Sequence, residues 1–220
     1  GSATVGGTTT NATATGFAGA TISFAEAFTT GSGSNYNQSL SCSKDSDSSA
    51  ITVTSNSITM PSDSAVTCSF NNSRIAQQLS LNKQWQNGAS GHTINVTSTG
   101  GSNNPTLSST SSGSNSTTGT AVTVYAGDVV TLPAETFGGG ATSGQYNSTL
   151  ACSGGTTLGS GAVSRSITIS NSTTATVCTY TNSRISNGIR LTKAWVNGKS
   201  GDAVSLSISG GSSAVAGSAT

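Results

Sequence analysis

Residues 79–88 read Leu-Ser-Leu-Asn-Lys-Gln-Trp-Gln-Asn-Gly, a strictly alternating stretch that ends in a turn dipeptide. Successive side chains of a β-strand point to opposite faces, so Lys83 and Trp85 share a face with two leucines, and polar side chains occupy the other face. Asn-Gly is a strong signal for a hairpin turn. The stretch therefore predicts a β-strand and a hairpin to residues 92–98, with Lys83 on the apolar face.

The same stretch recurs later in the chain, where residues 191–198 read Leu-Thr-Lys-Ala-Trp-Val-Asn-Gly. Two other motifs recur at the same offset, residues 36–42 at 146–152 and residues 68–75 at 178–185. A fixed period along a chain is typical of repeated structural units. The sequence therefore predicts an all-β fold of tandem, head-to-tail repeats of about 110 residues, each an Ig-like β-sandwich.

The order of the motifs along the chain gives one whole unit, with the motifs of a second unit split between the two ends of the sequence. Residues 79–184 contain every motif once, so we expect them to form one complete β-sandwich. Residues 1–74 are then a sandwich that lacks its first hairpin, and residues 189–220 are the opening hairpin of the next repeat. That hairpin would complete the neighbouring copy, either because the chain continues in a longer parent or because one subunit donates strands to another.

Charged residues are rare in this sequence. The 220 residues include 8 basic and 7 acidic side chains with a net charge of +1, whereas Ser and Thr make up more than a third of the chain. This gives no electrostatic basis for binding nucleic acid or an anionic membrane, and no apolar run is long enough to span a bilayer. One histidine and four cysteines leave little for a metal or catalytic site, so we expect no cofactor and no metal. Residues 100–120, rich in Gly, Ser, Thr and Asn, predict a long loop.

The four cysteines form two pairs with one spacing, because Cys42 and Cys68 are as far apart in the sequence as Cys152 and Cys178. Four cysteines allow three pairings, and the repeat favours one disulfide in each unit, since the same spacing must serve both copies. Disulfides indicate an extracellular location, whereas free buried thiols in a reducing compartment are the alternative. The expected disulfides are therefore Cys42–Cys68 and Cys152–Cys178.

Three charged positions recur in both units, and two of them fall on apolar faces. The recurring lysine shares a strand face with a leucine and a tryptophan, and Glu26 shares one with two phenylalanines. Burial disfavours the charged forms, so a buried lysine and a buried glutamate both shift toward neutrality. The recurring residues are Lys83/Lys193, Glu26/Glu135 and Arg74/Arg184, accompanied on the closing strand by the asparagines Asn72/Asn182.

A lysine, a glutamate and an asparagine in one core can form an amide bond without an enzyme. A neutral lysine amine attacks the asparagine carboxamide carbon, while the carboxylic acid polarises the carbonyl and shuttles protons. Ammonia leaves, and an isopeptide bond ties the first strand to the last. Proximity in a folded core replaces an enzyme, because it lowers such barriers by about 7–11 kcal/mol. The less specific interpretation is a lysine that extends toward solvent, with Glu135 as an ordinary surface partner.

The order of the motifs resembles that of the SpaA-like/CNA-B (prealbumin-like) Ig-type modules of bacterial surface proteins and pilins. The shared features are an opening strand with Leu-x-Lys, a central strand with x-Glu-x-Phe and a closing strand with Tyr-Thr-Asn-Ser. The Lys-x-Trp-x-Asn-Gly opening and the paired cysteines are more similar to tandem repeats of large Gram-negative adhesins. The resemblance covers essentially the whole chain, although cysteines are not typical of the family.

The resemblance also implies which residues react. In the family, the equivalent Lys and Asn form an intramolecular isopeptide bond and the Glu catalyses it. Asn71 precedes Asn72 in the first unit, which leaves open which of these two asparagines would react there. The implied complete set is Lys83, Glu135 and Asn182, and the incomplete set is Glu26 and Asn72, which await a lysine at the position of Lys193 from a neighbouring unit.

We therefore expect a structural repeat of an extracellular bacterial surface fibre or adhesin stalk, with itself as its head-to-tail partner. Neither a nucleic-acid partner nor membrane insertion is expected, and no constellation indicates an enzyme beyond the self-directed bond formation. The alternative is a carbohydrate- or host-receptor-binding adhesin module, in which aromatic side chains stack on sugar rings. Residues 44–47 contain two aspartates but lack the spacing of a calcium loop. The aromatic candidates are Trp85/Trp195 and Tyr36/Tyr146.

Overall fold

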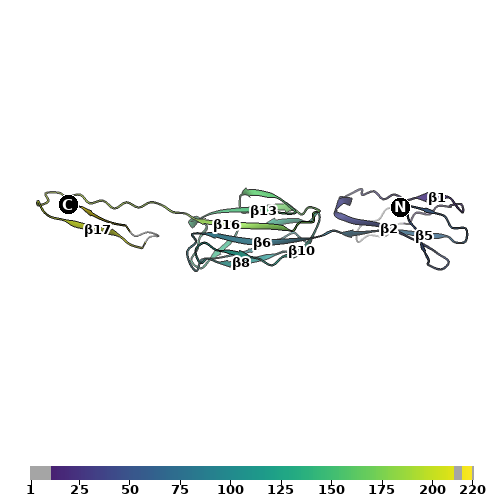
Figure 1. Cartoon of the computed structure of the whole chain (residues 1–220), viewed down its shortest axis with the longest axis horizontal. Coiled ribbons are helices and arrows are strands. Elements are labelled where there is room, and N and C mark those ends of the chain that lie inside the picture. Colours follow the sequence, from purple (N-terminus) through teal and green to yellow (C-terminus); the bar gives the residue numbers. More distant parts are fainter. Residues whose placement is uncertain (1–10, 211–214, 220) are drawn as a thin grey trace. The chain divides into compact units, whose positions relative to one another are not determined.

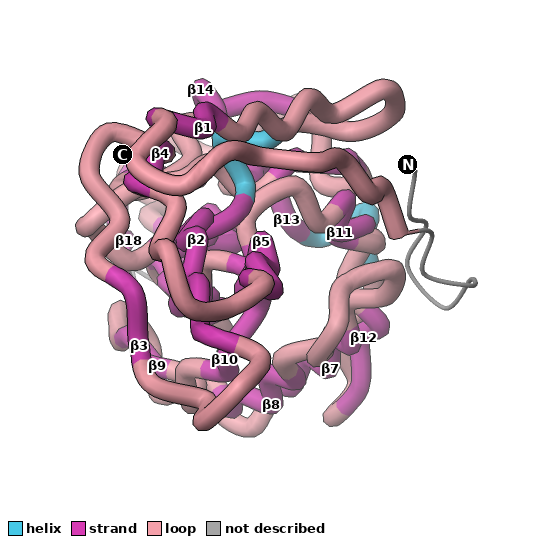
Figure 2. The backbone as a smooth tube through the Cα atoms, turned by 90° about the vertical axis from the view of Figure 1, so that its right-hand side faces the viewer, coloured by secondary structure: helices cyan, strands magenta, loops and turns pink. Residues whose placement is uncertain are grey.

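The chain is all-β, which confirms this part of the predicted fold class. The computed structural model describes residues 11–210 and 215–219, the latter by their backbone alone. Residues 1–10, 211–214 and 220 of the predicted segments 1–74 and 189–220 lie outside the described residues. The chain divides into two compact units, residues 1–184 and residues 185–220. Figure 2 shows strands and loops along nearly all of the described backbone.

Residues 76–184 form a β-sandwich with a well-filled core. Its larger sheet contains six strands, and the other strands form smaller sheets across the core (Figure 1). The larger sheet has the order β10 (Val122–Tyr125), β6 (Ala76–Gln86), β16 (Thr176–Arg184), β13 (Tyr146–Ser153) and β14 (Leu158–Gly161), with β9 (Ser116–Thr118) also paired to β6. The smaller sheets are β12 (Thr136–Gly138), β7 (Thr93–Thr97) and β8 (Thr106–Thr110), and β11 (Val129–Leu132) with β15 (Arg165–Thr168).

The core of this sandwich follows from the alternation in β6. Leu79, Leu81 and Trp85 are fully buried, and they meet Ile94 and Val96 of β7 from the other side of the core. This is the arrangement in which two sheets bury their apolar faces against each other. The first and last strands of the segment, β6 and β16, are parallel neighbours in the larger sheet.

The predicted hairpin at Asn87-Gly88 is wrong. β6 and β7 belong to different sheets, so this turn carries the chain across the sandwich and does not close a β-hairpin. Asn87 does adopt a left-handed backbone, with φ of 53°. The reason is the shared core: side chains of β6 and β7 both point inward, which requires the two strands to lie on opposite sides.

The predicted loop at residues 100–120 is also wrong in part, because β8 and β9 lie within it. Serine replaces apolar residues on the inward face here. Ser109 is buried, and its hydroxyl accepts a hydrogen bond from Trp85 Nε1 at 3.0 Å and contacts the Thr117 hydroxyl at 2.7 Å. The Ser- and Thr-rich composition predicted a loop. The fold instead buries some of these hydroxyl groups, because it supplies their hydrogen-bond partners.

Residues 11–74 form a thinner, open arrangement of strands. Cys42 and Ile58 are its buried apolar residues within the described part. Two short helical turns, η1 (Gly33–Asn35) here and η2 (Ser143–Gln145) in the second segment, each lead into a long strand. The sheets are β3 (Ala50–Ile51), β2 (Tyr36–Lys44) and β5 (Val66–Arg74) in that order, and β1 (Thr21–Ser23) with β4 (Ser57–Thr59).

The long strands of the two segments pair in the same register. In β2 and β5, Tyr36 lies opposite Arg74, and in β13 and β16, Tyr146 lies opposite Arg184. In the second unit, residues 185–220, the described residues form one pair of strands, β17 (Val204–Ile208) and β18 (Val215–Ala219). Residues 185–203 form no strand, so the strand predicted around Lys193 is absent from this unit.

Candidate functional site

Lys83 lies in the core of the complete sandwich, on the apolar face of β6. The residue is 1% exposed, because Leu81 and Trp85 flank it on the same face and the opposite sheet covers it. Its Nζ lies 2.8 Å from Glu135 Oε1, 3.4 Å from the Tyr180 carbonyl oxygen, and 4.6 Å from the centre of the Trp85 ring. The interpretation of Lys83 as a solvent-reaching residue is therefore wrong.

Glu135 enters the core from the loop between β11 and β12. Its side chain is almost fully buried, and the Lys83 ion pair is its polar contact. Neither carboxylate oxygen takes part in a hydrogen bond of good geometry. The loop is held over β16 by Tyr180, whose hydroxyl donates to the Pro133 carbonyl oxygen at 2.8 Å. The hydrogen bond between Tyr180 of β16 and Pro133 of this loop thus holds Glu135 over the closing strand.

Asn182 completes the group from β16, where it is 0% exposed. In the parallel pairing of β16 with β6, Tyr180 lies opposite Lys83 and Asn182 lies opposite Trp85. Asn182 is therefore a diagonal neighbour of Lys83 on the same face of the sheet. The Cα atoms of such neighbours lie about 8 Å apart, which a lysine side chain can span. Both polar atoms of the Asn182 amide are buried without a hydrogen-bond partner. A buried amide in that state costs about 1–3 kcal/mol.

Burial changes the protonation chemistry of this group. Desolvation lowers the pKa of Lys83 to about 8, although the nearby Glu135 carboxylate opposes the shift. Burial, and then the charge of Glu135, raise the pKa of Tyr180 well above its usual value. A lysine with a pKa near 8 releases its proton far more readily than a surface lysine. The site therefore combines an amine that can become a nucleophile, a carboxyl group at hydrogen-bond distance, and an unpartnered carboxamide.

The corresponding residues of the first segment are exposed. Asn72 Nδ2 donates to Glu26 Oε1 at 2.8 Å, so the structure brings these two predicted residues together. Both are exposed: Asn72 lies on β5, whereas Glu26 follows the end of β1 at Ser23 and is not on a strand. The predicted apolar strand face around Glu26 is therefore wrong.

Lys193 belongs to the second unit and is also exposed. Its Nζ lies 4.3 Å from the centre of the Trp195 ring, as Lys83 lies over Trp85, and it contacts the Ala194 carbonyl oxygen. The side chains around it are exposed as well, including Ile189 and Leu191. The contact between the lysine and its tryptophan thus forms in both segments, but only the pair of Lys83 and Trp85 is buried.

Both predicted disulfides are present in the structure. Cys42 is bonded to Cys68 across β2 and β5, and Cys152 is bonded to Cys178 across β13 and β16. The two bridges occupy corresponding positions in the two strand pairs. Each one fastens the closing strand of its segment to the strand beside it.

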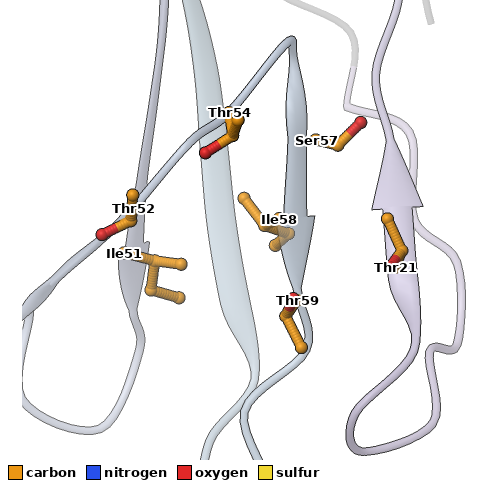
Figure 3. A pocket seen from close by; sticks show the side chains of 7 residues that line it. All are labelled: Thr21, Ile51, Thr52, Thr54, Ser57, Ile58 and Thr59. Carbon is orange, nitrogen blue, oxygen red and sulfur yellow. The ribbon is translucent and has the colours of Figure 1, made fainter.

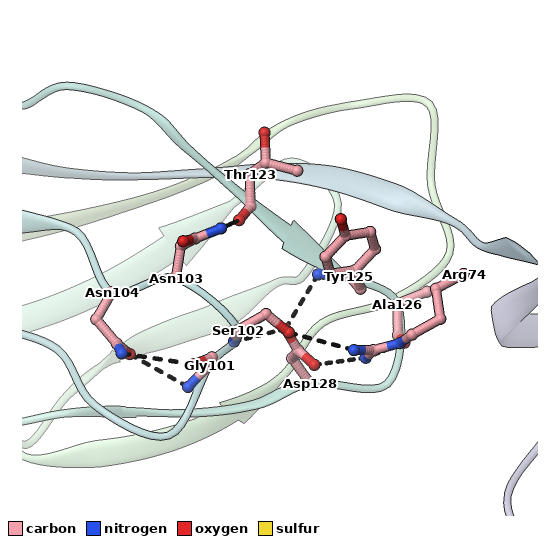
Figure 4. Close-up of polar contacts among 9 residues, drawn as sticks. All are labelled: Arg74, Gly101, Ser102, Asn103, Asn104, Thr123, Tyr125, Ala126 and Asp128. Atoms are coloured by element: carbon pink, nitrogen blue, oxygen red, sulfur yellow. Dashed lines mark hydrogen bonds and ion pairs between the residues drawn. The ribbon is translucent and has the colours of Figure 1, made fainter. Parts of the chain in front are cut away.

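A second polar cluster, which sequence reasoning missed, lies where β5 leads into β6 (Figure 4). Arg74 donates to Asp128 Oδ1 at 2.5 Å and its guanidinium lies 4.8 Å from the centre of the Tyr125 ring. Asp128 also accepts from the backbone N–H groups of Ser102 and Tyr125. Burial alone would raise the pKa of Asp128, but the hydrogen bonds from Arg74 and these N–H groups outweigh it and lower the pKa to about 2.

The motif comparison could have pointed to half of that cluster. Arg74 recurs as Arg184, but Asp128 does not recur, because residues 125–128 read Tyr-Ala-Gly-Asp and residues 17–20 read Phe-Ala-Gly-Ala. A sequence comparison that considers only the charged residues present in both segments therefore misses Asp128.

The two aromatic candidates of the complete sandwich, Trp85 and Tyr146, are not available to stack on a sugar. Trp85 is fully buried and Tyr146 nearly so, and their rings meet edge to face at 5.3 Å between centroids. The Tyr146 hydroxyl lies 2.8 Å from His92 Nδ1, within hydrogen-bond distance, and His92 is half-buried. Trp195 is 43% exposed, and Tyr36 is half-buried against Phe28.

The acidic loop at residues 44–47 is held by its own contacts. Lys44 pairs with Asp63 at 2.9 Å, and Asp45 and Asp47 accept hydrogen bonds from Thr67 and Ser49. The described residues contain no group of three or more side chains suited to hold a metal ion. In residues 11–210, no helix is both long and apolar enough to cross a membrane.

Comparison with known proteins places this fold in a family. The family model for the SpaA-type prealbumin-like fold domain matches the chain twice, over residues 1–74 and residues 76–184. No curated protein and no solved structure is significantly similar to the chain. The two matches end at the closing strands β5 and β16, where the disulfides and asparagines lie. The chain therefore belongs to the family of SpaA-type prealbumin-like fold domains.

Proposed function

We propose that this chain is a structural module of an extracellular bacterial surface fibre or adhesin stalk, in which tandem sandwiches are clamped by disulfides and by a Lys83–Asn182 isopeptide bond. The observation that carries the proposal is the buried group of Lys83, Glu135 and Asn182, with the Lys83 ion pair at 2.8 Å and an Asn182 amide that has no hydrogen-bond partner. Membership of the SpaA-type family supports a structural role.

The tandem arrangement is supported by the two segments themselves. Both match the same family model, and their long strands pair in one register, with each disulfide at the corresponding place. Residues 11–74 and 76–184 are then successive copies of one module. Two disulfides support an oxidising, extracellular compartment, since such bonds rarely persist in the cytosol.

The bond forms in the core by exchange of one amide for another. A proton moves from Lys83 to Glu135 over the 2.8 Å contact, which leaves a neutral amine beside a carboxylic acid. The amine attacks the Asn182 carboxamide carbon while the Glu135 acid donates to its oxygen. Glu135 then passes a proton from the former lysine nitrogen to the departing amide nitrogen, and it takes back the proton on the oxygen as the carbonyl re-forms. One C–N bond forms, one breaks, and ammonia leaves with the proton balance unchanged.

Such a bond would suit a fibre under tension. Pulling the two ends of residues 76–184 loads the start of β6 and the end of β16. A covalent link between Lys83 and Asn182 carries that force from strand to strand, so the chain between these residues forms a closed loop outside the load path. Before the reaction, the polar atoms of the Asn182 amide are buried without hydrogen-bond partners. After the reaction, the amide bond that joins Lys83 to Asn182 carries no charge.

The alternative function as a carbohydrate-binding module has weaker support, since Trp85 and Tyr146 of the complete sandwich lie in its core.

Intact mass spectrometry of the reduced chain tests the proposal. The expected mass is lower than the sequence mass by one ammonia per intramolecular bond, and peptide mapping joins the peptides of Lys83 and Asn182. Glu135→Gln and Asn182→Ala should each restore the full mass, whereas Lys199→Ala, which changes an exposed lysine, should leave the ammonia loss intact. A folded wild-type chain with its full sequence mass would refute the bond.

A further inference from the structure

A serine hydroxyl that the proposed reaction does not use lies beside Asn182. In the antiparallel pairing of β13 with β16, Ser148 lies directly opposite Asn182. Its Oγ is buried, and no described residue gives it a hydrogen-bond partner. The nitrogen and the oxygen of the Asn182 amide are in the same state. Two residues that face each other across one strand pair thus hold buried polar atoms that lack partners on both sides.

Ser148 belongs to the core face of β13. Side chains two positions apart on a strand point to the same face, and the neighbours of Ser148 on that face, Tyr146 and Leu150, are both buried in the core. Burying a hydroxyl group without a hydrogen bond destabilises a fold, and an alanine at this position would avoid that cost. Packing alone therefore gives no reason for a serine here.

The side chains of Ser148 and Asn182 are close enough to meet. The Cβ atoms of directly opposite residues in an antiparallel pair lie about 4.5–5.5 Å apart. Ser148 Oγ is one bond beyond its Cβ and Asn182 Oδ1 is two bonds beyond its own, so rotation about the side-chain bonds brings these atoms to hydrogen-bond distance. Lys83 reaches Asn182 from β6 on the other side, and Glu135 reaches it from the loop over β16. An amide oxygen has two lone pairs, so it can accept from Glu135 and Ser148 together.

The other side-chain donors of this part of the core already have partners. A second donor to the Asn182 oxygen must be an N–H or O–H group that is not engaged elsewhere. Within the described residues, Ser148 is the hydroxyl beside Asn182 that meets this condition. The engaged groups are Trp85 Nε1, which donates to the Ser109 hydroxyl, the Tyr180 hydroxyl, which donates to the Pro133 carbonyl oxygen, and the Tyr146 hydroxyl, which lies 2.8 Å from His92 Nδ1.

We propose that the Ser148 hydroxyl donates a hydrogen bond to the Asn182 carboxamide oxygen and stabilises the negative charge that develops there as Lys83 attacks. The inference rests on the proposed function, since it concerns the same bond. When the Lys83 nitrogen adds to the Asn182 carbon, an electron pair of the carbonyl bond moves onto the oxygen, and a fixed donor at that oxygen lowers the barrier. Ser148 keeps its own proton throughout, so one C–N bond still forms, one breaks, and ammonia leaves. In the product the same hydroxyl donates to the oxygen of the new amide.

The first segment shows the same pairing in an exposed setting. Gln38 lies opposite Asn72 there, and both residues are exposed. The described part of this segment is also less closely packed, since an open pocket of about 540 Å³ lies among β1, β3 and β4, with Ile51 and Ile58 in its lining (Figure 3). A hydrogen-bond donor stabilises developing charge strongly only where water is excluded. We therefore assign this role to Ser148 and not to Gln38.

Two variants of nearly equal shape test this role. Ser148→Thr keeps the hydroxyl, Ser148→Val replaces it with a methyl group, and both side chains are favoured in strands. The whole chain is isolated in denaturant and diluted into folding buffer, and intact mass follows the loss of ammonia. Ser148→Thr should react at close to the wild-type rate, whereas Ser148→Val and Ser148→Ala should react about 100-fold more slowly, as when one donor is removed from an oxyanion site. The matched control is Ser153→Ala, on the exposed face of the same strand, which should react at the wild-type rate.

Two readouts separate a role in the reaction from a role in folding. Circular dichroism of the same samples gives the folded fraction, so that rates are compared per folded chain. The rate of Ser148→Val should keep the pH dependence of the wild type, because the proton shared by Lys83 and Glu135 is unaffected. Equal rates for Ser148→Thr and Ser148→Val, or a changed pH dependence in Ser148→Val, would overturn the inference and leave the proposed function intact. A wild-type chain that keeps its full sequence mass would overturn both.

Discussion

Residues 76–97 and residues 186–208 carry the same motifs but have different structures. In the first, β6 is buried in a six-stranded sheet and its lysine lies in the core. In the second, residues 185–203 form no strand and Lys193 is exposed. The local contact of the lysine with its tryptophan is present in both. In the first case the motif lies beside a closing strand, β16, and in the second no described strand of its own unit lies beside it.

The largest expected effect comes from the two tryptophans. Trp85→Ala removes a fully buried side chain and should lower the free energy of unfolding by about 3–5 kcal/mol. Trp195→Ala changes a side chain that is 43% exposed and should change it by less than about 0.5 kcal/mol. Thermal or denaturant unfolding of the monomeric chain measures both. Equal effects would mean that the second motif is packed as the first one is.

The disulfides give the next largest effect. Each closes a loop of 26 residues, which should stabilise its segment by about 3 kcal/mol in the chain-entropy model. Cys42→Ser with Cys68→Ser should unfold residues 11–74, because that segment buries few apolar side chains. Cys152→Ser with Cys178→Ser should leave residues 76–184 folded, since their core is large. Hydrogen exchange resolved by segment measures this contrast, and the opposite order would contradict it.

The Arg74–Asp128 cluster predicts a smaller, pH-dependent effect. The pKa of Asp128 is lowered to about 2 from a usual value of 3.8. A carboxyl group with a depressed pKa stabilises the fold above its unfolded pKa and loses that effect as the pH falls through the folded value. About 2 kcal/mol should therefore be lost between about pH 4 and pH 2.

Asp128→Asn should remove this acid dependence and lower stability at neutral pH. The matched control is Asp63→Asn, which breaks an exposed ion pair with Lys44 and should change the stability little. Chemical unfolding between pH 2 and pH 7 compares the two variants. An unchanged acid transition in Asp128→Asn would show that another carboxyl group causes it.

The smallest expected effect concerns the rate of bond formation in the sandwich. Lys83 and Glu135 share one proton below about pH 8, where the pKa of Lys83 lies. The reactive neutral pair carries the same proton as the ion pair, so the rate should be constant in the neutral range just below that pH. Above about pH 8 the pair loses this proton, and Glu135 can no longer donate it. The rate should then fall by about tenfold per pH unit, which corresponds to a rise of about 1.4 kcal/mol in the activation free energy.

Chain isolated in denaturant and never previously folded allows this rate to be measured. Dilution into buffers of different pH starts folding, and intact mass follows the loss of ammonia with time. Circular dichroism of the same samples shows that folding itself is complete at each pH. A rate that rises through pH 8 would mean that the free amine limits the reaction and that Glu135 is not the proton donor.

The sequence predicted the elements that depend on local alternation. The strand faces of β6 and β16, the spacing of the cysteines and the positions of Lys83 and Asn182 follow from period-2 patterns that recur at one offset. Glu135 recurs from Glu26 at an offset one residue shorter, and it lies in a loop. The sequence failed where the answer depended on distant partners. β8 and β9 were missed because Ser109 is inward-facing through its hydrogen bonds, and Asp128 was missed because it acts through Arg74, 54 residues earlier in the chain.

The sequence by itself determined that the chain is all-β, that its motifs occur twice, and that a lysine and an asparagine lie on inward strand faces, with a recurring glutamate as their companion. Only the tertiary structure decided which copy of that group is buried. Alternation determines which side chains lie on one face of a strand, but what covers that face is decided by strands far away in the sequence. For Lys83 that cover is the opposite sheet, together with β16 at its side, and for Lys193 no described strand of its own unit provides it.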